Sequence, residues 1–315
     1  MRQKIFWLFL GLSFSLWGCN RAPEARPVAI VSETSATRTI AHTFGTTEIP
    51  KTPERIIALG EEGLLVDLLD LGIQPVGSTV NLPDHLPLFT AEELDGIEQL
   101  ISSTSVSMES LVALNPDLII GTVFFINEIG FGQLSEIAPT IAVRGSDPLG
   151  TYLEAASVFG LREQAEQEVA QFREEIAGVA EELHPRQLEV TVATIYPGPS
   201  VALWFGGVQP GPEMLNQLGV TLLPTGAARE ELDIRNGRVF ISDERYDLIM
   251  GEPLILLQNS YVEGEMDAMA EMEANALWQQ LPAMQSGNVI TLDRLGYPGF
   301  RGQIALLADL REALK

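Results

Sequence analysis

The chain has 315 residues, of which 43 are acidic and 19 are basic, so its formal net charge at pH 7 is −24. A chain this acidic repels polyanions, which excludes nucleic acid as a partner. The single cysteine excludes a disulfide within the chain, and the length suits one large domain or two lobes, of which we expect two.

The first residues have the pattern of an export signal. Two basic residues precede an apolar stretch over residues 5–17, which is too short to cross a bilayer because a spanning helix takes about 20 residues. The sequence Leu-Trp-Gly-Cys that ends at Cys19 resembles the lipobox of bacterial lipoproteins. We therefore expect a signal peptide over residues 1–18 and a lipid on Cys19, which would hold the protein to a membrane on its periplasmic or extracytoplasmic face.

The rest of the chain divides by composition. Residues 19–41 are rich in Ala, Pro, Arg, Ser and Thr with little periodicity, which predicts a lipidated flexible tether. We expect an N-terminal α/β lobe over residues 42–147, a connecting helix over residues 148–184 and a C-terminal α/β lobe over residues 185–315.

In the first lobe, short apolar runs alternate with helical patterns. Residues 55–59 and 117–121 read as buried strands, and the leucines between positions 64 and 69 repeat at helical spacing. This alternation is typical of a parallel sheet covered by helices. The fold class is therefore predicted to be α/β.

The segment between the lobes predicts one long amphipathic helix. Its acidic residues lie opposite one apolar face, which is formed by Val169, Phe172, Ile176, Val179 and Leu183. Gly160 is a possible point of interruption, and the helix should end before Pro185.

After Pro185 the alternation of strands and helices resumes. Strands are predicted over residues 190–195, 220–223, 254–257 and 289–292. Two Rossmann-like lobes joined by a single long rigid helix are the simplest arrangement. Because ligands of such sheets bind at the carboxyl ends of the strands, we expect a ligand cleft between the lobes.

One short pattern occurs once in each lobe. Ser107 precedes Glu109 by two residues, and Ser242 precedes Glu244 in the same way. Helix capping explains both, because Ser is a good N-cap and a Glu in the first turn interacts favourably with the helix dipole.

Longer segments resemble a known family. Residues 53–59 (PERIIAL), 71–77 (LGIQPVG), 109–120 (ESLVALNPDLII) and 277–290 (LWQQLPAMQSGNVI) are similar to the periplasmic binding proteins of ABC importers for iron-siderophores, haem and cobalamin. The similarity extends over residues 42–314.

This resemblance implies a function and partners. It implies a monomeric, non-enzymatic substrate-binding component that captures an iron-siderophore-like metal chelate and delivers it to an ABC permease and its ATPase. It also implies that Glu109 and Glu244 dock onto arginines of the permease, and the match is closer at Glu109. The ligand would be a ferric chelate, with no resident cofactor; haem, cobalamin, a bare metal ion and an extracytoplasmic enzyme remain alternatives.

Candidate ligand contacts are aromatic and arginine residues expected in loops after strands. Aromatic rings pack on a planar or chelated ligand, and arginines pair with its anionic groups. Trp204 is the first choice, although core packing equally explains Phe124 and Phe125, and a solvated surface position explains Arg144. The full set is Phe124, Phe125, Arg144, Tyr196, Trp204, Tyr261, Tyr297 and Arg301.

Two alternatives lack a sequence signal. His42, His85 and His184 fit no metal-ligand spacing, whereas a bare-ion site would need converging His, Asp and Glu ligands. The enzyme alternative lacks a nucleophile elbow, a phosphate-binding loop and a zinc-protease motif. We therefore predict no metal site and no catalytic residues.

Overall fold

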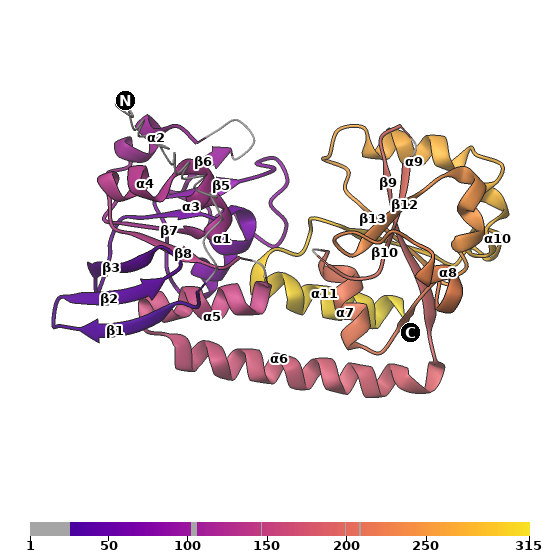
Figure 1. The fold of residues 1–315 in the computed structure, drawn as a ribbon, viewed down its shortest axis with the longest axis horizontal. Helices are drawn as coiled ribbons and strands as arrows, with labels where there is room; N and C mark the ends of the chain where they lie inside the picture. Colours follow the sequence, from indigo (N-terminus) through magenta and orange to yellow (C-terminus); the bar gives the residue numbers. More distant parts are fainter. Residues whose placement is uncertain (1–25, 102–105, 146, 199, 208) are drawn as a thin grey trace, which may run out of the picture.

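The computed structural model describes residues 26–101, 106–145, 147–198, 200–207 and 209–315. They form two α/β lobes side by side above a pair of long helices (Figure 1). The predicted fold class, with two lobes and a connecting helix, is confirmed. The expected signal peptide and Cys19 lie outside the described residues.

A small antiparallel sheet precedes the first lobe and corrects the predicted tether. Its strand order is β1-β2-β3, with β1 at Ala29–Glu33, β2 at Thr37–His42 and β3 at Gly45–Pro50. The tether expected over residues 19–41 therefore ends no later than Ala29. The Thr and Ser residues of this segment suggested a tether, but every second residue of β2 is buried, namely Arg38, Ile40 and His42.

The first lobe has a parallel five-stranded sheet in the order β6-β5-β4-β7-β8. The chain therefore winds outward from β4 in both directions, and the switch point lies between β4 and β7. The strands are β4 (Ile56–Leu59), β5 (Gly77–Val80), β6 (Glu98–Ile101), β7 (Leu118–Thr122) and β8 (Thr140–Val143). The helices are α1 (Glu61–Asp70), α2 (Met108–Ala113), α3 (Val123–Ile129) and α4 (Phe131–Ile137).

The connecting segment consists of two helices, α5 (Pro148–Phe159) and α6 (Arg162–Leu183). They are separated at Gly160, whose φ of 74° lies in the left-handed region that glycine adopts at low cost. All five apolar residues of the predicted face are buried in α6. Figure 1 shows that α6 runs beneath both lobes and connects them.

The second lobe has a mixed sheet in the order β12-β10-β9-β13-β14, with β11 paired to β9. Strands β9, β13 and β14 are parallel, but β10 is antiparallel to both of its neighbours. The predicted strict alternation is wrong for β10 and β12, because β10 follows β9 directly in a hairpin and its residues read as a loop. The strands are β9 (Glu189–Tyr196), β10 (Ser200–Trp204), β11 (Thr221–Leu222), β12 (Arg238–Ile241), β13 (Leu254–Gln258) and β14 (Val289–Asp293).

Short helices connect these strands, and one long helix ends the chain. They are η2 (His184–Arg186), α7 (Pro210–Gln217), α8 (Gly226–Glu230), η3 (Asp243–Leu248), α9 (Glu265–Glu273), η4 (Trp278–Gln280), α10 (Pro282–Ser286) and α11 (Gly299–Ala313). In the described part of the chain, no helix is both long and apolar enough to span a bilayer.

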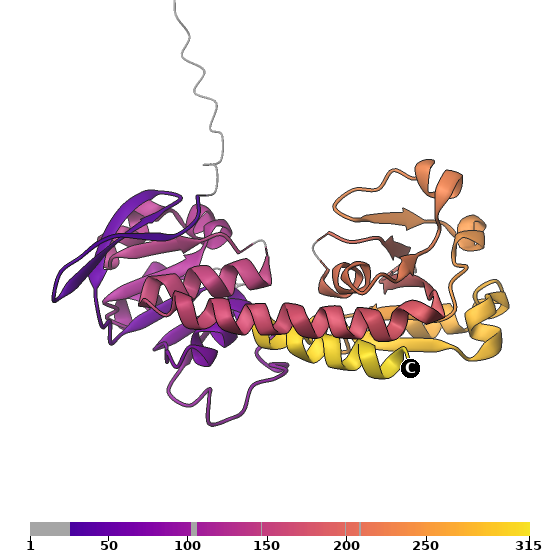
Figure 2. The same ribbon diagram turned by 90° about the horizontal axis from the view of Figure 1, so that it is seen from below.

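The last helix, α11, is a second connection between the lobes. It starts against α1 and α5 of the first lobe and continues along α7 of the second, beside α6 (Figure 2). The ring of Phe300 stacks on Tyr152 of α5 at 4.7 Å and meets Phe172 of α6 edge-on at 5.5 Å. The predicted single connecting helix is therefore reinforced by a helix that the periodicity did not place between the lobes.

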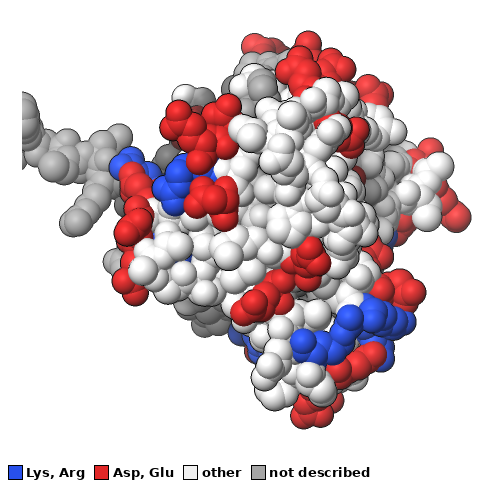
Figure 3. Space-filling model, turned by 90° about the vertical axis from the view of Figure 1, so that its right-hand side faces the viewer, with Lys and Arg blue, Asp and Glu red and all other residues white. Residues whose placement is uncertain are grey.

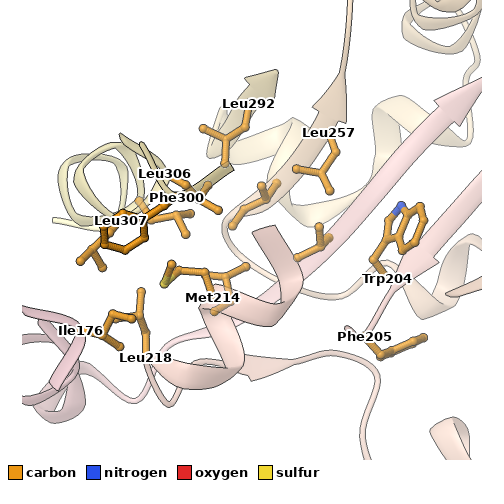
Figure 4. Close-up of a cluster of buried hydrophobic side chains, with 14 of the residues drawn as sticks. Ile176, Trp204, Phe205, Met214, Leu218, Leu257, Leu292, Phe300, Leu306 and Leu307 are labelled. Carbon is orange, nitrogen blue, oxygen red and sulfur yellow. The ribbon is translucent and has the colours of Figure 1, made fainter. Parts of the chain in front are cut away.

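The core of the second lobe extends onto both long helices. Figure 4 shows Ile176 of α6 near Met214 of α7 and near Leu218, which directly follows α7, with Leu306 and Leu307 of α11 on the other side of the same cluster. Burying large aliphatic side chains stabilises a fold by about 1.5–3 kcal/mol each. The lobes are thus fixed at their base, and the cleft lies on the opposite side.

Candidate ligand-binding cleft

A cavity of about 280 Å³ lies between the two lobes. The residues of its first wall directly follow the carboxyl ends of β4 and β5, next to the switch point of the first sheet. The residues of its second wall lie at the start of α7 and in the loop after β14. This is the location that the parallel strands predict. The lining residues are Gly60, Glu61, Glu62, Gly63, Asn81, Leu82, His85, Gln209, Pro210, Arg294, Leu295, Tyr297 and Pro298.

The first wall is a turn held by hydrogen bonds. The backbone N–H groups of Gly60 and Glu61 both donate to Thr79 Oγ1 at 3.0 Å. Glu61 has a φ of 55°, a conformation that costs a non-glycine residue about 1 kcal/mol or more. Glu62 Oε1 accepts from the N–H groups of Asn81 and Leu82 at 2.7 and 3.1 Å. The wall is therefore fixed before any ligand arrives.

The second wall carries an arginine whose charge is balanced. Arg294 Nε donates to Glu265 Oε1 at 2.8 Å, and the side chain of Glu265 is fully buried. Glu265 Oε2 accepts from Asn259 N–H at 2.8 Å. Tyr297 O–H donates to Asp309 Oδ2 at 2.7 Å. The pKa of Tyr297 is raised, mainly because the phenol is buried and in addition because of this hydrogen bond. Both side chains are thus oriented by partners within their own lobe.

An arginine–aromatic cluster continues from Arg294 over the second sheet; it consists of Tyr196, Trp204, Arg238, Phe240 and Arg294. The guanidinium of Arg238 lies 5.1 Å from the ring centres of Trp204 and Phe240 and 5.8 Å from that of Tyr196. It also donates from Nη1 to the phenol oxygen of Tyr196 at 3.0 Å. The guanidinium of Arg294 lies 5.9 Å from the centre of the same Tyr196 ring. The cluster combines cationic and aromatic groups, which suit an anionic ligand with planar parts.

Arg238 differs from Arg294 in its partners. Arg294 is paired with Glu265, whereas among the described residues no carboxylate forms an ion pair with Arg238, whose contacts are rings and a phenol oxygen. Arg229 is similar, because its guanidinium lies 4.4 Å from the ring centre of Phe205. These two arginines retain the capacity to bind an external anion.

Trp204, the first choice from the sequence, is a core residue. Its side chain is 1% exposed, and its indole N–H donates to Thr194 Oγ1 at 3.0 Å within the sheet. Figure 4 places it among buried apolar side chains. The prediction that Trp204 faces a ligand from a loop is wrong here, because the residue ends strand β10. Its ring instead packs against the guanidinium of Arg238.

The other predicted contacts are divided between the cleft and other locations. Tyr297 lines the cavity, and Tyr196 belongs to the arginine–aromatic cluster. Tyr261 is half-exposed and stacks on His85 at the edge of the cavity. These three candidates are brought together by the fold.

The remaining candidates have partners elsewhere. Phe124 is 66% exposed and Phe125 packs on the first lobe's core, and the two rings meet edge-on. Arg144 is bound to Glu154, and Arg301 is bound to Asp70 and Glu93 on the α1 side of α11. Both guanidinium groups form ion pairs with carboxylates, so the structure does not support ligand contact by Arg144 or Arg301.

Sequence reasoning missed Arg238, Arg294 and His85. Arg294 directly follows strand β14, so its position at the carboxyl end of a strand would have indicated a ligand contact. Arg238, by contrast, begins a strand that was not predicted. His85 lies in the loop after β5 and was considered only as a metal ligand. His42 lies in β2 and His184 in η2, so the three histidines belong to different parts of the fold.

The two candidate docking residues are both exposed. Glu109 lies in the first turn of α2, where Ser107 caps the helix by accepting from Ser110 N–H at 3.0 Å. Glu244 lies in the first turn of η3, where Ser242 makes no side-chain cap. Capping thus explains the serine in the first lobe only. Acidic side chains are also spread over the end of the second lobe, whereas basic ones occupy two small areas there (Figure 3).

The sequence is similar to a family of binding proteins over parts of both lobes. The family model described as periplasmic binding protein matches residues 97–294, more than half of the chain. The chain belongs to this family. It is 27% identical over 310 residues to the probable siderophore-binding lipoprotein YfiY of Bacillus subtilis (strain 168), covering 93% of this chain and 91% of that protein.

Two further proteins are similar over most of their length. The putative ABC transporter substrate-binding lipoprotein YhfQ of Bacillus subtilis (strain 168) is 24% identical over 290 residues, covering 87% of this chain and 88% of the relative. The crystal structure of Staphylococcus aureus SirA complexed with staphyloferrin B has a TM-score of 0.71 at 22% identity, and the match covers 88% of this chain and 98% of the SirA chain. The SirA structure supports the fold.

Proposed function

We propose that this periplasmic binding protein captures an anionic ferric chelate of the siderophore type in its interlobe cleft, as a binding component without catalytic activity. The observation that carries the proposal is Arg238, which is surrounded by three aromatic rings and lacks a carboxylate partner among the described residues. Family membership and the similarity to a probable siderophore-binding lipoprotein support the same ligand class.

The chemistry of such a ligand matches the cluster. A ferric ion wrapped by carboxylate or catecholate groups has an anionic exterior, and arginine binds such oxygens through paired N–H donors. The rings of Tyr196 and Phe240 supply apolar surface for the organic part of the chelate. The protein itself would need no resident cofactor, because the metal arrives already coordinated.

Delivery would follow through an ABC permease and its ATPase. Glu109 on the first lobe and Glu244 on the second are exposed carboxylates suited to arginines of the permease. Exposed ion pairs contribute little affinity, about 0–1 kcal/mol each, so they would orient the encounter and still allow release. The Leu-Trp-Gly-Cys motif at Cys19 supports a lipid anchor that keeps a monomeric receptor at the extracytoplasmic face of the membrane.

A titration tests the ligand class and the role of Arg238 together. The protein is mixed with ferric citrate, ferric enterobactin, the metal-free chelators and free ferric ion, and tryptophan fluorescence is followed. We expect quenching by a ferric chelate, with Arg238→Ala weakening binding about 10- to 100-fold, the loss typical of a charged hydrogen bond. Arg238→Lys should be intermediate, because lysine keeps the charge without the planar pair of donors.

The matched control is Arg173→Ala, an exposed arginine on α6, which should bind as the parent does. Tight quenching by the free ion alone would contradict the chelate proposal and favour a bare-ion carrier. Equal affinity of the Arg238→Ala variant would remove the arginine–aromatic cluster from the site.

A further inference from the structure

One side-chain pair joins the two lobes across the mouth of the cavity. His85, in the first lobe's loop after β5, lies with Nε2 2.5 Å from Oδ2 of Asp293, the last residue of β14 in the second lobe. The His85 ring also stacks on Tyr261 of the second lobe, at 4.3 Å between ring centres and an interplanar angle of 11°. The contact therefore combines a polar bond with a ring stack.

The second lobe holds its half of the contact in place. Asp293 Oδ1 accepts from Asn259 Nδ2 at 2.6 Å and from Leu295 N–H at 3.0 Å. Oδ2 is left for His85. Asn259 also positions the stacking residue, because its Oδ1 accepts from Tyr261 N–H at 2.9 Å. One asparagine thus orients both groups that meet His85.

The first lobe holds its half through the loop of residues 81–97. The loop starts at the two N–H groups bound by Glu62, and His85 N–H donates to Leu82 O at 2.9 Å. Farther along, Arg301 of α11 donates to Leu88 O at 2.7 Å. The loop is anchored on both sides of His85, so its ring is presented to the second lobe in a fixed position.

The cavity behind this contact is small for the proposed ligand. Its volume is about 280 Å³, below the roughly 300–1,000 Å³ of ordinary small-molecule sites. A chelate therefore enters or leaves between the lobes only while His85 and Asp293 are apart, and the contact forms again once the ligand is inside or has left. The pair is partly exposed, with side chains 19% and 32% accessible, so its bond is weak enough to open readily.

We propose that His85 and Asp293, with Tyr261, form an interlobe latch that holds the cleft closed and controls the rate of ligand exchange. The latch acts by positioning the lobes and does not require that His85 touch the ligand. This inference deepens the proposed function, but its first test below needs no ligand and stands apart from it.

The first test measures the distance between the lobes in ligand-free protein. Cys19 is the only cysteine, so the mature chain with Cys19→Ser accepts spin labels at two introduced positions alone. Exposed sites are Glu136→Cys on α4 and Glu271→Cys on α9. Pulsed electron-spin measurements should give a narrow distribution for the parent and a broader one at longer distances for His85→Ala and for Asp293→Ala.

The double variant distinguishes a latch from two separate effects. If the residues act through each other, His85→Ala with Asp293→Ala should open the lobes no further than either change alone. The control is His184→Ala at the exposed end of α6, which should leave the distribution unchanged. Circular dichroism confirms that each variant is folded, and a folded His85→Ala variant with the parent distribution would overturn the latch.

The second test uses ferric citrate and ferric enterobactin as probes and follows dissociation by stopped flow. Whichever probe binds the parent should dissociate about 3- to 10-fold faster from His85→Ala, as expected for a lost partly exposed hydrogen bond. Unchanged dissociation would contradict a role in exchange even if the lobes open. Failure of both probes to bind the parent would count against the proposed function, while the distance measurement would still decide the latch.

Discussion

At the scale of single residues, the same amino acid has different roles according to its partners. Arg294 is neutralised by buried Glu265, whereas Arg238 faces three rings and no carboxylate among the described residues. Trp204 and Tyr196 were both predicted to be ligand contacts, yet only Tyr196 remains at the site because Trp204 faces the core. Partners and exposure depend on packing between distant segments, which residue type and spacing do not encode.

His42 provides a prediction about acid stability. Burial lowers its pKa from 6.5 to about 4, so the folded state binds fewer protons than the unfolded state between these values. Its contribution to stability is complete above pH 6.5 and is lost as the pH falls toward 4. At about pH 5 the free energy of unfolding should be about 2 kcal/mol lower than at pH 7.

Denaturant titrations between about pH 5 and pH 7 check this, with His42→Asn as the comparison. The asparagine variant is less stable throughout, because it loses packing, but its stability should change less with pH over this window. His184→Ala, whose parent side chain is exposed, should keep the parent slope. A slope in His42→Asn equal to the parent's would show that another group is responsible.

At the scale of elements, the sequence predicted those whose periodicity is strong. The apolar face of α6 and the core strands β4, β7, β9 and β13 agree with the structure because their patterns are long or wholly buried. Strands β1, β2, β10 and β12 are no shorter than β4, but they were missed because each forms by antiparallel pairing with a neighbour, which its own sequence does not show. Part of the site was missed with them, because Arg238 begins β12.

Helices α2 and η3 give a prediction about transport. Glu109→Ala combined with Glu244→Ala should leave the affinity for a ferric chelate unchanged, since neither residue lines the cavity. Uptake of iron-55 supplied as the chelate should fall, and more so at low salt than at physiological salt, because salt screens the long-range attraction that the variant has lost. The control replaces Glu174 and Glu181, two exposed acidic residues of α6, and uptake at the parent rate in the first variant would exclude docking by this pair.

At the scale of the whole molecule, two helices fix the lobes at their base while a weak polar contact closes the top. Helix α6 carries the chain from the first lobe to the second, and α11 packs on both through Phe300 and its buried leucines. A rigid base limits how far the lobes separate, so small changes at the cleft suffice for loading. The architecture suits a carrier that binds a ligand in the cleft and releases it again.

Native mass spectrometry can show directly whether this cleft carries a ferric chelate. The protein is purified gently from the bacterium that makes it, after growth under iron starvation, and is exposed to the spent medium. We expect a bound species whose mass is that of an organic chelator plus iron and which is lost in the Arg238→Ala variant. A bare metal ion, haem, a cobalamin, an iron-free molecule or no bound species at all would contradict it.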